Sequence, residues 1–188
     1  MSYLFMYRTL YLSLFLWTSW PVVASDYKEL IWDDLIPEAE LEVMKQISSL
    51  LTNPHQPLDP NADIRDDINN AMDQINDPDI QGVMNSINVR PELNNQVVSI
   101  PGFVVPLETN DENAITEFFL VPYFGACIHV PPPPPNQIIF VRYEKGLKVE
   151  GIWMPFEIKG TLFTDLIEND TAISAYTFVA DEVIEYIE

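Results

Sequence analysis

The stretch Val97-Val98-Ser99-Ile100-Pro101-Gly102-Phe103-Val104-Val105 holds two strand-like runs on either side of a proline–glycine pair. β-Branched and aromatic residues favour strands, and a proline and a glycine inside such a run mark a bend or a bulge. We therefore interpret the whole stretch as one bent strand. A strand that bends in this way can coil, as the strands of a small barrel must.

Further strand-like runs follow toward the carboxyl end, over residues 116–123, 138–143 and 172–179. A turn is expected at Lys145–Gly146. The aromatic segment Val149–Phe163 contains Pro155 and Gly160, and it predicts two strands or one sharply bent strand. The last segment, Asp181–Ile187, fits either a turn of helix or a closing strand, and we favour the helix.

Helical spacing is found before residue 96, where apolar residues recur at three- and four-residue steps: Leu41, Met44, Ile47 and Leu51. This spacing predicts a helix over Glu38–Leu51, and similar spacing predicts a short one over Asp63–Ile75. The strand-like runs after residue 96 predict a mainly β (α+β) fold. We expect a small OB-like barrel or a strongly twisted antiparallel sheet, with one or two N-terminal helices packed on it. Closing the barrel would hide the edges of the sheet.

The first residues have the features of an export signal, because Leu10–Trp20 is almost wholly apolar and Val22-Val23-Ala24 has the spacing that signal peptidase accepts. The apolar stretch is shorter than the about 20 residues that a membrane-spanning helix needs. We therefore expect a signal peptide over residues 1–25, no stable membrane span after its cleavage, and a single exported domain over 26–188. Within this domain, residues 26–96 are expected to be a helical and irregular acidic segment, and residues 97–188 the β-rich core.

The charge balance excludes one class of partner. The chain carries 29 acidic residues against 9 basic ones, for a net charge of −20 at pH 7. Such a chain repels phosphate backbones, so we expect no nucleic-acid partner. Its composition, 47% hydrophobic and 12% aromatic, is too apolar for a disordered chain. We expect a folded protein in the periplasm or outside the cell.

Cys127 and His129 are the residues best suited to chemistry. Cys127 is the only cysteine, so it cannot form a disulfide within the chain. On a strand, two residues at this spacing point to the same face, about 7 Å apart. Three interpretations stay open. The pair binds zinc or copper(I) together with carboxylates, or the imidazole activates the thiolate, or a buried thiol lies beside a structural histidine.

Five consecutive prolines follow this pair. At about 3.1 Å per residue they would form a polyproline II rod about 15 Å long. Such a rod can serve as a docking surface, but strand-like runs tether this one at both ends, and we interpret it as a strap that fixes the loop. The structural loop then begins at Gly125 and includes two amides that tie down its end. Its further members are Pro131, Pro132, Pro133, Pro134, Pro135, Asn136 and Gln137.

Three motifs stand out by their unusual composition. They are Trp32-Asp33-Asp34-Leu35-Ile36-Pro37, then Gly102-Phe103-Val104-Val105-Pro106-Leu107, and then Pro122-Tyr123-Phe124-Gly125-Ala126-Cys127-Ile128-His129-Val130 with the proline run and Asn136-Gln137. Together they resemble the exported bacterial domain-of-unknown-function family 3299. The resemblance implies a periplasmic or secreted protein that is encoded near transporter components, some of them linked to zinc supply. It implies no established activity.

We therefore expect a non-enzymatic periplasmic accessory or binding protein, which handles zinc through Cys127 and His129 alongside an envelope transporter component. The first alternative is a thiol-dependent enzyme, with Cys127 as the nucleophile and His129 as the base. The second alternative is a protein-interaction module that docks a partner on the proline run.

Overall fold

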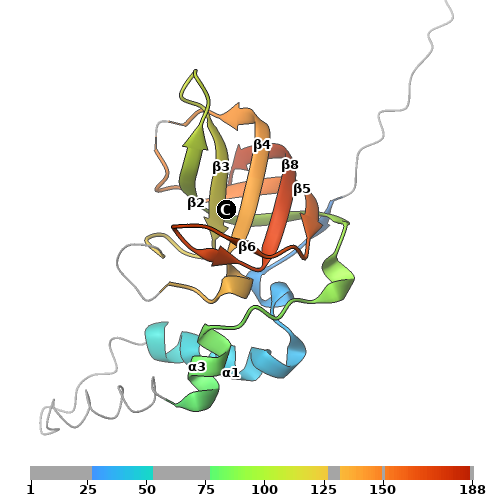
Figure 1. Ribbon diagram of the computed structural model, residues 1–188, viewed down its shortest axis with the longest axis vertical. Coiled ribbons are helices and arrows are strands. Elements are labelled where there is room, and N and C mark those ends of the chain that lie inside the picture. Colours follow the sequence, from blue (N-terminus) through green and yellow to red (C-terminus); the bar gives the residue numbers. More distant parts are fainter. Residues whose placement is uncertain (1–26, 53–76, 127–131, 150, 187–188) are drawn as a thin grey trace, which may run out of the picture.

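The computed structural model describes residues 27–52, 77–126, 132–149 and 151–186. In these parts of the chain a small β-barrel stands over two helices (Figure 1). The elements before the barrel are β1 (Lys28–Glu29), the 3-10 helix η1 (Trp32–Leu35), α1 (Glu38–Thr52), α3 (Pro78–Met84) and the 3-10 helix η2 (Pro91–Leu93). The predicted mainly β fold with N-terminal helices packed on it is confirmed.

Five strands close the barrel: β2 (Gln96–Thr109), β3 (Ile115–Val121), β4 (Ile139–Leu147), β5 (Phe156–Phe163) and β8 (Tyr176–Glu185). They follow the order β2-β3-β4-β8-β5, and β5 pairs back with β2. These pairs are antiparallel except for β4 with β8, which run parallel. A five-stranded barrel with this order and this parallel pair has the OB-type topology, so the predicted OB-like barrel is confirmed.

β2 is the bent strand expected from its sequence, and it joins the two sides of the barrel. Its first half, Gln96–Gly102, pairs with β5, and its second half, Phe103–Thr109, pairs with β3. The change of partner falls at Gly102, where a Cβ atom would lie 2.8 Å from Leu120 Cγ and 2.9 Å from the carbonyl oxygen of Val121. Only glycine lets the strand pass so close to its neighbour, and for this reason the proline–glycine pair decides the fold.

Two predictions for the carboxyl-terminal part are wrong. Lys145–Gly146 is not a turn between elements, because it lies inside β4, whose Leu147 still pairs with Ile115. Gly146 has a φ angle of 72°, which marks an irregularity of the strand rather than its end. The last segment is not helical either, because β8 continues to Glu185, which pairs with Phe156. In both cases pairing with another strand outweighs the local preference of the sequence.

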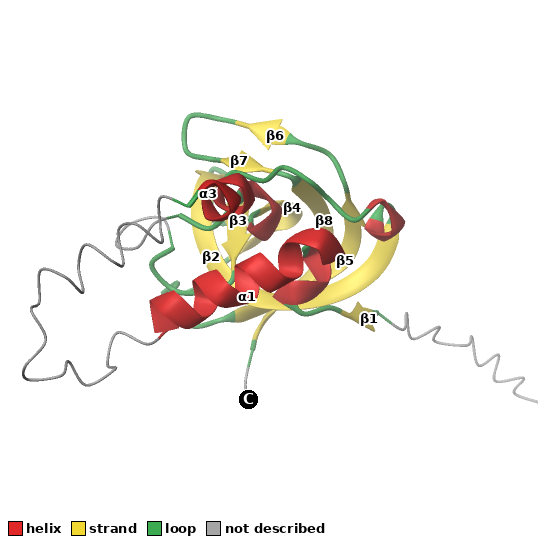
Figure 2. Cartoon of the chain, turned by 90° about the horizontal axis from the view of Figure 1, so that it is seen from below, coloured by secondary structure: helices red, strands yellow, loops and turns green. Residues whose placement is uncertain are grey.

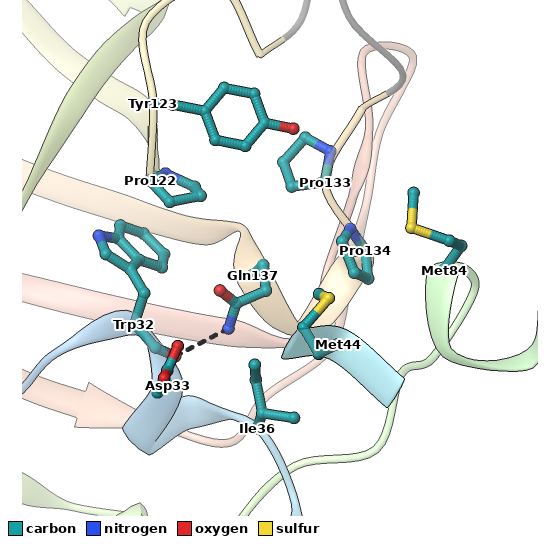
Figure 3. A pocket seen from close by; sticks show the side chains of 10 residues that line it. All are labelled: Trp32, Asp33, Ile36, Met44, Met84, Pro122, Tyr123, Pro133, Pro134 and Gln137. Atoms are coloured by element: carbon teal, nitrogen blue, oxygen red, sulfur yellow. Dashed lines mark hydrogen bonds between the residues drawn. The ribbon is translucent and has the colours of Figure 1, made fainter. Parts of the chain in front are cut away.

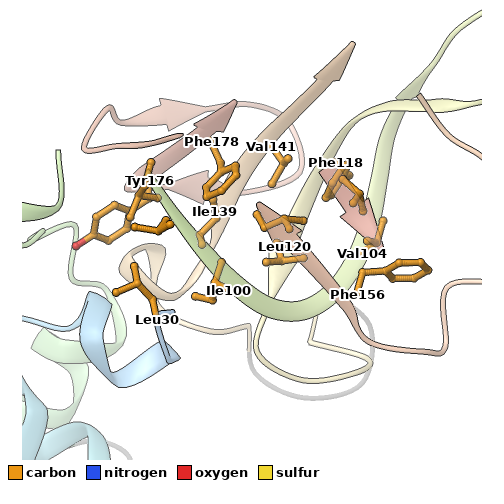
Figure 4. Packing of buried hydrophobic residues seen from close by; sticks show 14 of the residues in the cluster. Leu30, Ile100, Val104, Phe118, Leu120, Ile139, Val141, Phe156, Tyr176 and Phe178 are labelled. Carbon is orange, nitrogen blue, oxygen red and sulfur yellow. The ribbon is translucent and has the colours of Figure 1, made fainter. Parts of the chain in front are cut away.

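The barrel interior is filled by buried apolar side chains from all five strands (Figure 4). They include Ile100, Val104, Phe118, Leu120, Ile139, Val141, Phe156, Ile158, Leu162 and Phe178. Leu30 and Leu35 join this core from the amino-terminal segment, together with Tyr176 of β8. The Tyr176 hydroxyl donates to the carbonyl oxygen of Leu35 at 2.8 Å and accepts from the backbone N–H of Arg90 at 2.8 Å. The segment before α1 therefore closes one end of the barrel.

A hairpin of β6 (Ile167–Glu168) and β7 (Ile173–Ser174) covers the outer face of β3 and β4 (Figure 1). It packs against a second apolar cluster around Phe119 and Phe140. The Ser174 hydroxyl fixes the hairpin to β4, since its oxygen accepts from the Phe140 N–H at 3.0 Å. OB proteins bind oligonucleotides on their second and third strands, which correspond to β3 and β4. This chain fills that face with its own hairpin.

α1 confirms the helix expected over Glu38–Leu51 and ends one residue later, at Thr52. The helix expected over Asp63–Ile75 lies outside the described residues. Figure 2 shows α1 and α3 on the same side of the barrel.

α3 was not predicted. The Asp77 carboxylate caps its start by accepting from the Asp79 N–H at 2.8 Å, and Ile80 and Val83 pack on the side of α1 that carries Met44. A helix of seven residues is too short for apolar periodicity to reveal it, and it depends on this packing for its stability.

Candidate functional site

A pocket of about 170 Å³ lies where the barrel, η1, the two helices and the proline run meet (Figure 3). We call it the strap pocket. Its walls come from stretches that are distant in the sequence: Trp32, Asp33, Ile36, Met44, Met84, Pro122, Tyr123, Pro133, Pro134 and Gln137. Most of this lining is apolar, with a few polar groups among it, as is usual for small-molecule sites.

The described part of the proline run forms one wall of the strap pocket. Pro132 is exposed, Pro133 and Pro134 are buried, and the 3-10 helix η3 (Pro135–Gln137) ends the run. Figure 3 shows the buried rings on the same side of the pocket as Met84. Because proline has a fixed φ angle, the wall loses little conformational entropy when it is ordered. The two buried rings are used inside the protein and are not presented to a partner.

Two buried amides hold the end of this wall. The Gln137 Nε2 group donates to the carbonyl oxygen of Trp32 at 2.9 Å and so joins the strap to η1. The Asn136 Nδ2 group donates to Glu40 Oε2 at 3.1 Å and to the carbonyl oxygen of Asn88 at 3.1 Å. Asn136 is 0% exposed and Gln137 is 5% exposed, so water does not compete for these hydrogen bonds.

Glu40 of α1 is the common acceptor of a polar network. Its Oε1 atom accepts from the Ser86 hydroxyl at 2.9 Å and from the Asn88 Nδ2 group at 2.6 Å, while Oε2 accepts from Asn136. The Asn136 Oδ1 atom is buried and has no partner among the described residues. Turning this amide over would not help, because both partners of its nitrogen are acceptors. The network joins α1, the segment before β2 and the strap.

Trp32 lies on the other side of the strap pocket from Pro134 (Figure 3). Its indole Nε1 donates to the carbonyl oxygen of Pro101 at 2.8 Å. A Cβ atom at Gly102 would lie 2.9 Å from the Trp32 ring, so the glycine that bends β2 also makes room for the indole. In the same motif, Leu35 is fully buried and Asp33 is exposed. The Trp32–Pro37 motif therefore supplies both an anchor on the core and a pocket wall.

The polar groups of the pocket are mainly acceptors. Gln137 uses its Nε2 group for the carbonyl oxygens of Trp32 and Asn136, and its Oε1 atom has no partner among the described residues. The Asp33 carboxylate has none there either, and the Trp32 N–H is occupied by its bond to β2. Tyr123 contributes its aromatic ring to the lining. A ligand thus meets one carboxylate, one amide oxygen and aromatic faces.

Cys127, His129 and Pro131 lie outside the described residues. Both ends of the loop that carries them belong to the strap pocket, since Tyr123 precedes the loop and Pro133 follows it.

Gly125, at the start of the expected structural loop, has a φ angle of 81°, and no atom lies within 4 Å of a Cβ placed there. The backbone conformation, rather than close packing, therefore requires glycine at this position. In the parts of the chain that the structure describes, no group of three His, Cys, Asp or Glu side chains could hold a metal ion.

The sequence did not reveal Met44 and Met84 as pocket residues. Helical spacing places Met44 on the apolar face of α1, where packing in a core is the ordinary role of methionine. Met84 ends α3, whose existence was not predicted. The Trp32–Pro37 motif is the sequence feature that could have indicated the pocket, because it places the charged Asp33 beside a tryptophan that packs on the core.

These features define a class: a small OB-type barrel that builds a pocket at the helical side instead of on the usual ligand face. The chain belongs to the family described as protein of unknown function (DUF3299), which it matches over residues 32–185. The predicted family is confirmed.

The chain is also similar to a crystal structure, at 2.45 Å resolution, of a DUF3299 family protein from Pseudomonas aeruginosa PAO1. The two chains are 33% identical, with a TM-score of 0.61, and the match covers 86% of this chain and 97% of that one. A comparison with curated proteins gives no match. Within the described residues, no helix is both long enough and apolar enough to cross a membrane.

Proposed function

We propose that this protein is a non-enzymatic accessory or binding protein of the bacterial envelope, periplasmic or secreted, which binds zinc through Cys127 and His129. The observation that carries this proposal is the attachment of their loop to the strap pocket at both ends, through Tyr123 and Pro133. Metal ligands must be held in position by their surroundings, and in this proposal Tyr123 and Pro133, on either side of the segment, give that support.

Asp33 supports the choice of zinc. Zinc accepts cysteine, histidine and carboxylate ligands, and an open site has three protein ligands. The Asp33 carboxylate is exposed, has no partner among the described residues and lines the pocket to which the loop is attached. In this proposal Asp33 is the third ligand, beside Cys127 and His129.

The lining of the strap pocket favours binding over catalysis. None of the described residues that line it is a serine, cysteine or histidine, so they supply no nucleophile with its base. The thiol-dependent enzyme remains the alternative at Cys127 and His129, and it requires a reactive thiol. Alkylation of Cys127 by iodoacetamide in the native protein, at a rate above that of a free thiol, would support the enzyme.

A transporter component of the envelope is the proposed partner, as the family resemblance implies. The proline run is not the surface that we propose for this contact, because Pro133 and Pro134 are buried and among its described prolines Pro132 alone is exposed. A protein with a net charge of −20 favours a cationic partner surface. Co-purification of the transporter component with the full chain from the periplasmic fraction tests both the location and the partner.

Equilibrium dialysis of the purified chain with zinc tests the metal site. We expect uptake of one zinc per chain with a dissociation constant below about 10 μM, and loss of this uptake in Cys127→Ala and in His129→Ala. Asp33→Asn should weaken it about tenfold, whereas Asp34→Asn, with the same change in charge, should not. Unchanged uptake in the Cys127 and His129 variants would overturn the proposal.

A further inference from the structure

We propose that the strap pocket binds a small organic cation, an ammonium group carried on an apolar body about the size of a benzene ring. The inference rests on the proposed binding role of this pocket, and it needs no metal ion. It names the ligand class that the described walls of the pocket select.

The volume of the pocket limits the ligand to a small molecule. A protein cavity of about 150 Å³ with apolar walls holds one benzene molecule, and the strap pocket measures about 170 Å³. Drug-sized ligands occupy pockets of about 300–1,000 Å³ and are too large. Ile36, Met44 and Met84 provide an apolar floor and side for the ring, and the methionine thioethers adapt to its shape.

Gln137 requires the ligand to be a hydrogen-bond donor. Its side chain is 95% buried, and two hydrogen bonds from Nε2, at 2.9 Å to Trp32 and 3.2 Å to Asn136, fix the orientation of the amide. The Oε1 atom is therefore held in place as an acceptor with no partner in the described part of the chain. An acceptor that lines the pocket without a partner gains most from a ligand N–H, and more if that N–H is charged.

The charges and rings around this acceptor favour a cation. Asp33 supplies a carboxylate at the exposed side of the pocket, and Trp32 and Tyr123 supply aromatic faces that attract ammonium groups. The net charge of −20 raises the local concentration of cations and repels anions. An alcohol of the same shape keeps the hydrogen bond but loses the charge, and a carboxylate loses both.

The probes that test this selectivity are benzylammonium, benzyl alcohol and benzoate. Each is titrated into the purified full chain in the presence of EDTA, and binding is followed by NMR of labelled methionine methyl groups. We expect benzylammonium to bind with a dissociation constant of about 1 mM or tighter and to shift the methyl signals of Met44 and Met84. The signal of Met154, which does not line the pocket, should not move. Benzyl alcohol should bind about tenfold more weakly, and benzoate should not bind.

A matched pair of variants tests the role of the carboxylate. Asp33→Asn should weaken benzylammonium binding about twofold to fivefold, as expected for an exposed ion pair, whereas Asp34→Asn should leave it unchanged. Met84→Lys, which brings an ammonium group of the protein into the pocket, should abolish binding. Dispersed amide signals from the barrel strands show that the variants are folded.

Equal binding of the three probes, equal effects of the two aspartate variants, or titration without movement of the Met44 and Met84 signals would overturn the inference. Cys127→Ala should keep benzylammonium binding while it loses zinc. Failure of zinc binding and failure of cation binding are therefore separate results, and loss of benzylammonium binding in folded Cys127→Ala would also count against the inference.

Discussion

The amide nitrogen of Asn136 lies 3.1 Å from the carboxylate Oε2 of Glu40, although the two residues are 96 positions apart in the sequence. This contact joins the strap to α1, and Glu40 also accepts from Ser86 and Asn88. Hydrogen bonds to a charged acceptor contribute about 1.5–3 kcal/mol each, more than bonds between neutral groups. The same network, which places the strap beside the pocket, is therefore expected to contribute to the stability of the folded protein.

Glu40→Gln should lower the free energy of unfolding by about 1–3 kcal/mol, although the two side chains have the same shape. The new amide NH₂ would face donor groups of Ser86, Asn88 or Asn136, because all three donate to the carboxylate. Urea unfolding measures the change. Glu38→Gln, at an exposed position of the same helix, should change stability by less than about 0.5 kcal/mol. Equal effects of the two variants would contradict the role of the network.

Gly102→Ala should destabilise the protein by about 1–3 kcal/mol, because the new methyl group would lie within 3 Å of Leu120, Trp32 and the backbone of Val121. Gly82 in α3 is the matched control, since no atom lies within 4 Å of a Cβ placed there. Gly82→Ala should stabilise the protein by about 0.5–1 kcal/mol through its better helix propensity. Thermal unfolding midpoints that move in opposite directions confirm the prediction, and a stabilised Gly102→Ala protein would refute it.

Tyr176→Phe should lower the free energy of unfolding by about 1–3 kcal/mol at neutral pH, since the buried carbonyl of Leu35 and the N–H of Arg90 lose their partner. Chemical denaturation at pH 7 measures this loss. A change close to zero would mean that water replaces the hydroxyl.

The same hydroxyl gives a prediction at high pH. Burial raises the pKa of Tyr176 to about 12 in the folded protein, from about 10 in the unfolded chain. The neutral phenol is favoured by folding, so its contribution is complete below pH 10 and is lost as the pH rises toward 12. The loss amounts to about 2–3 kcal/mol. Between pH 9 and pH 12 the wild type should lose more stability than Tyr176→Phe, and equal slopes would contradict the assignment.

Ser174→Ala should loosen the hairpin that covers β3 and β4. The Ser174 hydroxyl accepts from the Phe140 N–H at 3.0 Å and lies 2.7 Å from the carbonyl oxygens of both Ile138 and Tyr176, which share its single proton. Its removal takes the acceptor from the buried Phe140 N–H and the hydroxyl proton from the two carbonyl oxygens, which costs about 1–3 kcal/mol. Hydrogen exchange at the Phe140 amide should become faster, while exchange at Leu120 inside the barrel serves as the control. Unchanged protection of Phe140 would show that another group takes over.

The barrel could be predicted because its signals are local. The apolar runs around Pro101 and Gly102 show where a strand bends, and the close approach of Leu120 explains why the bend needs glycine. The end of β8 could not be predicted in this way. Its acidic residues suit a helix equally well, and its pairing with Phe156 decides the outcome. The turn predicted at Lys145–Gly146 is wrong for a similar reason, because Gly146 permits a turn but lies inside β4.

Only part of the strap pocket could be predicted from the sequence. The proline run and the amides of Asn136 and Gln137 marked a fixed loop, and the buried hydrogen bonds of the two amides agree with such a role. Met44 and Met84 reach the pocket from two helices, and no local pattern connects them with the prolines. Pockets assembled from distant elements depend on tertiary packing, which a single sequence does not display.

The five consecutive prolines of the strap cannot be observed by any method that detects backbone N–H groups. Proline has no backbone N–H, so residues 131–135 give no signal in amide-detected NMR spectra and no protection in hydrogen exchange. Ligand binding must therefore be followed through N–H groups next to the strap. The side-chain NH₂ of Gln137 and the indole N–H of Trp32 both carry protons, and both lie in the pocket wall. A molecule that enters the pocket should therefore shift the signals of these two groups, although the strap itself gives no amide signal.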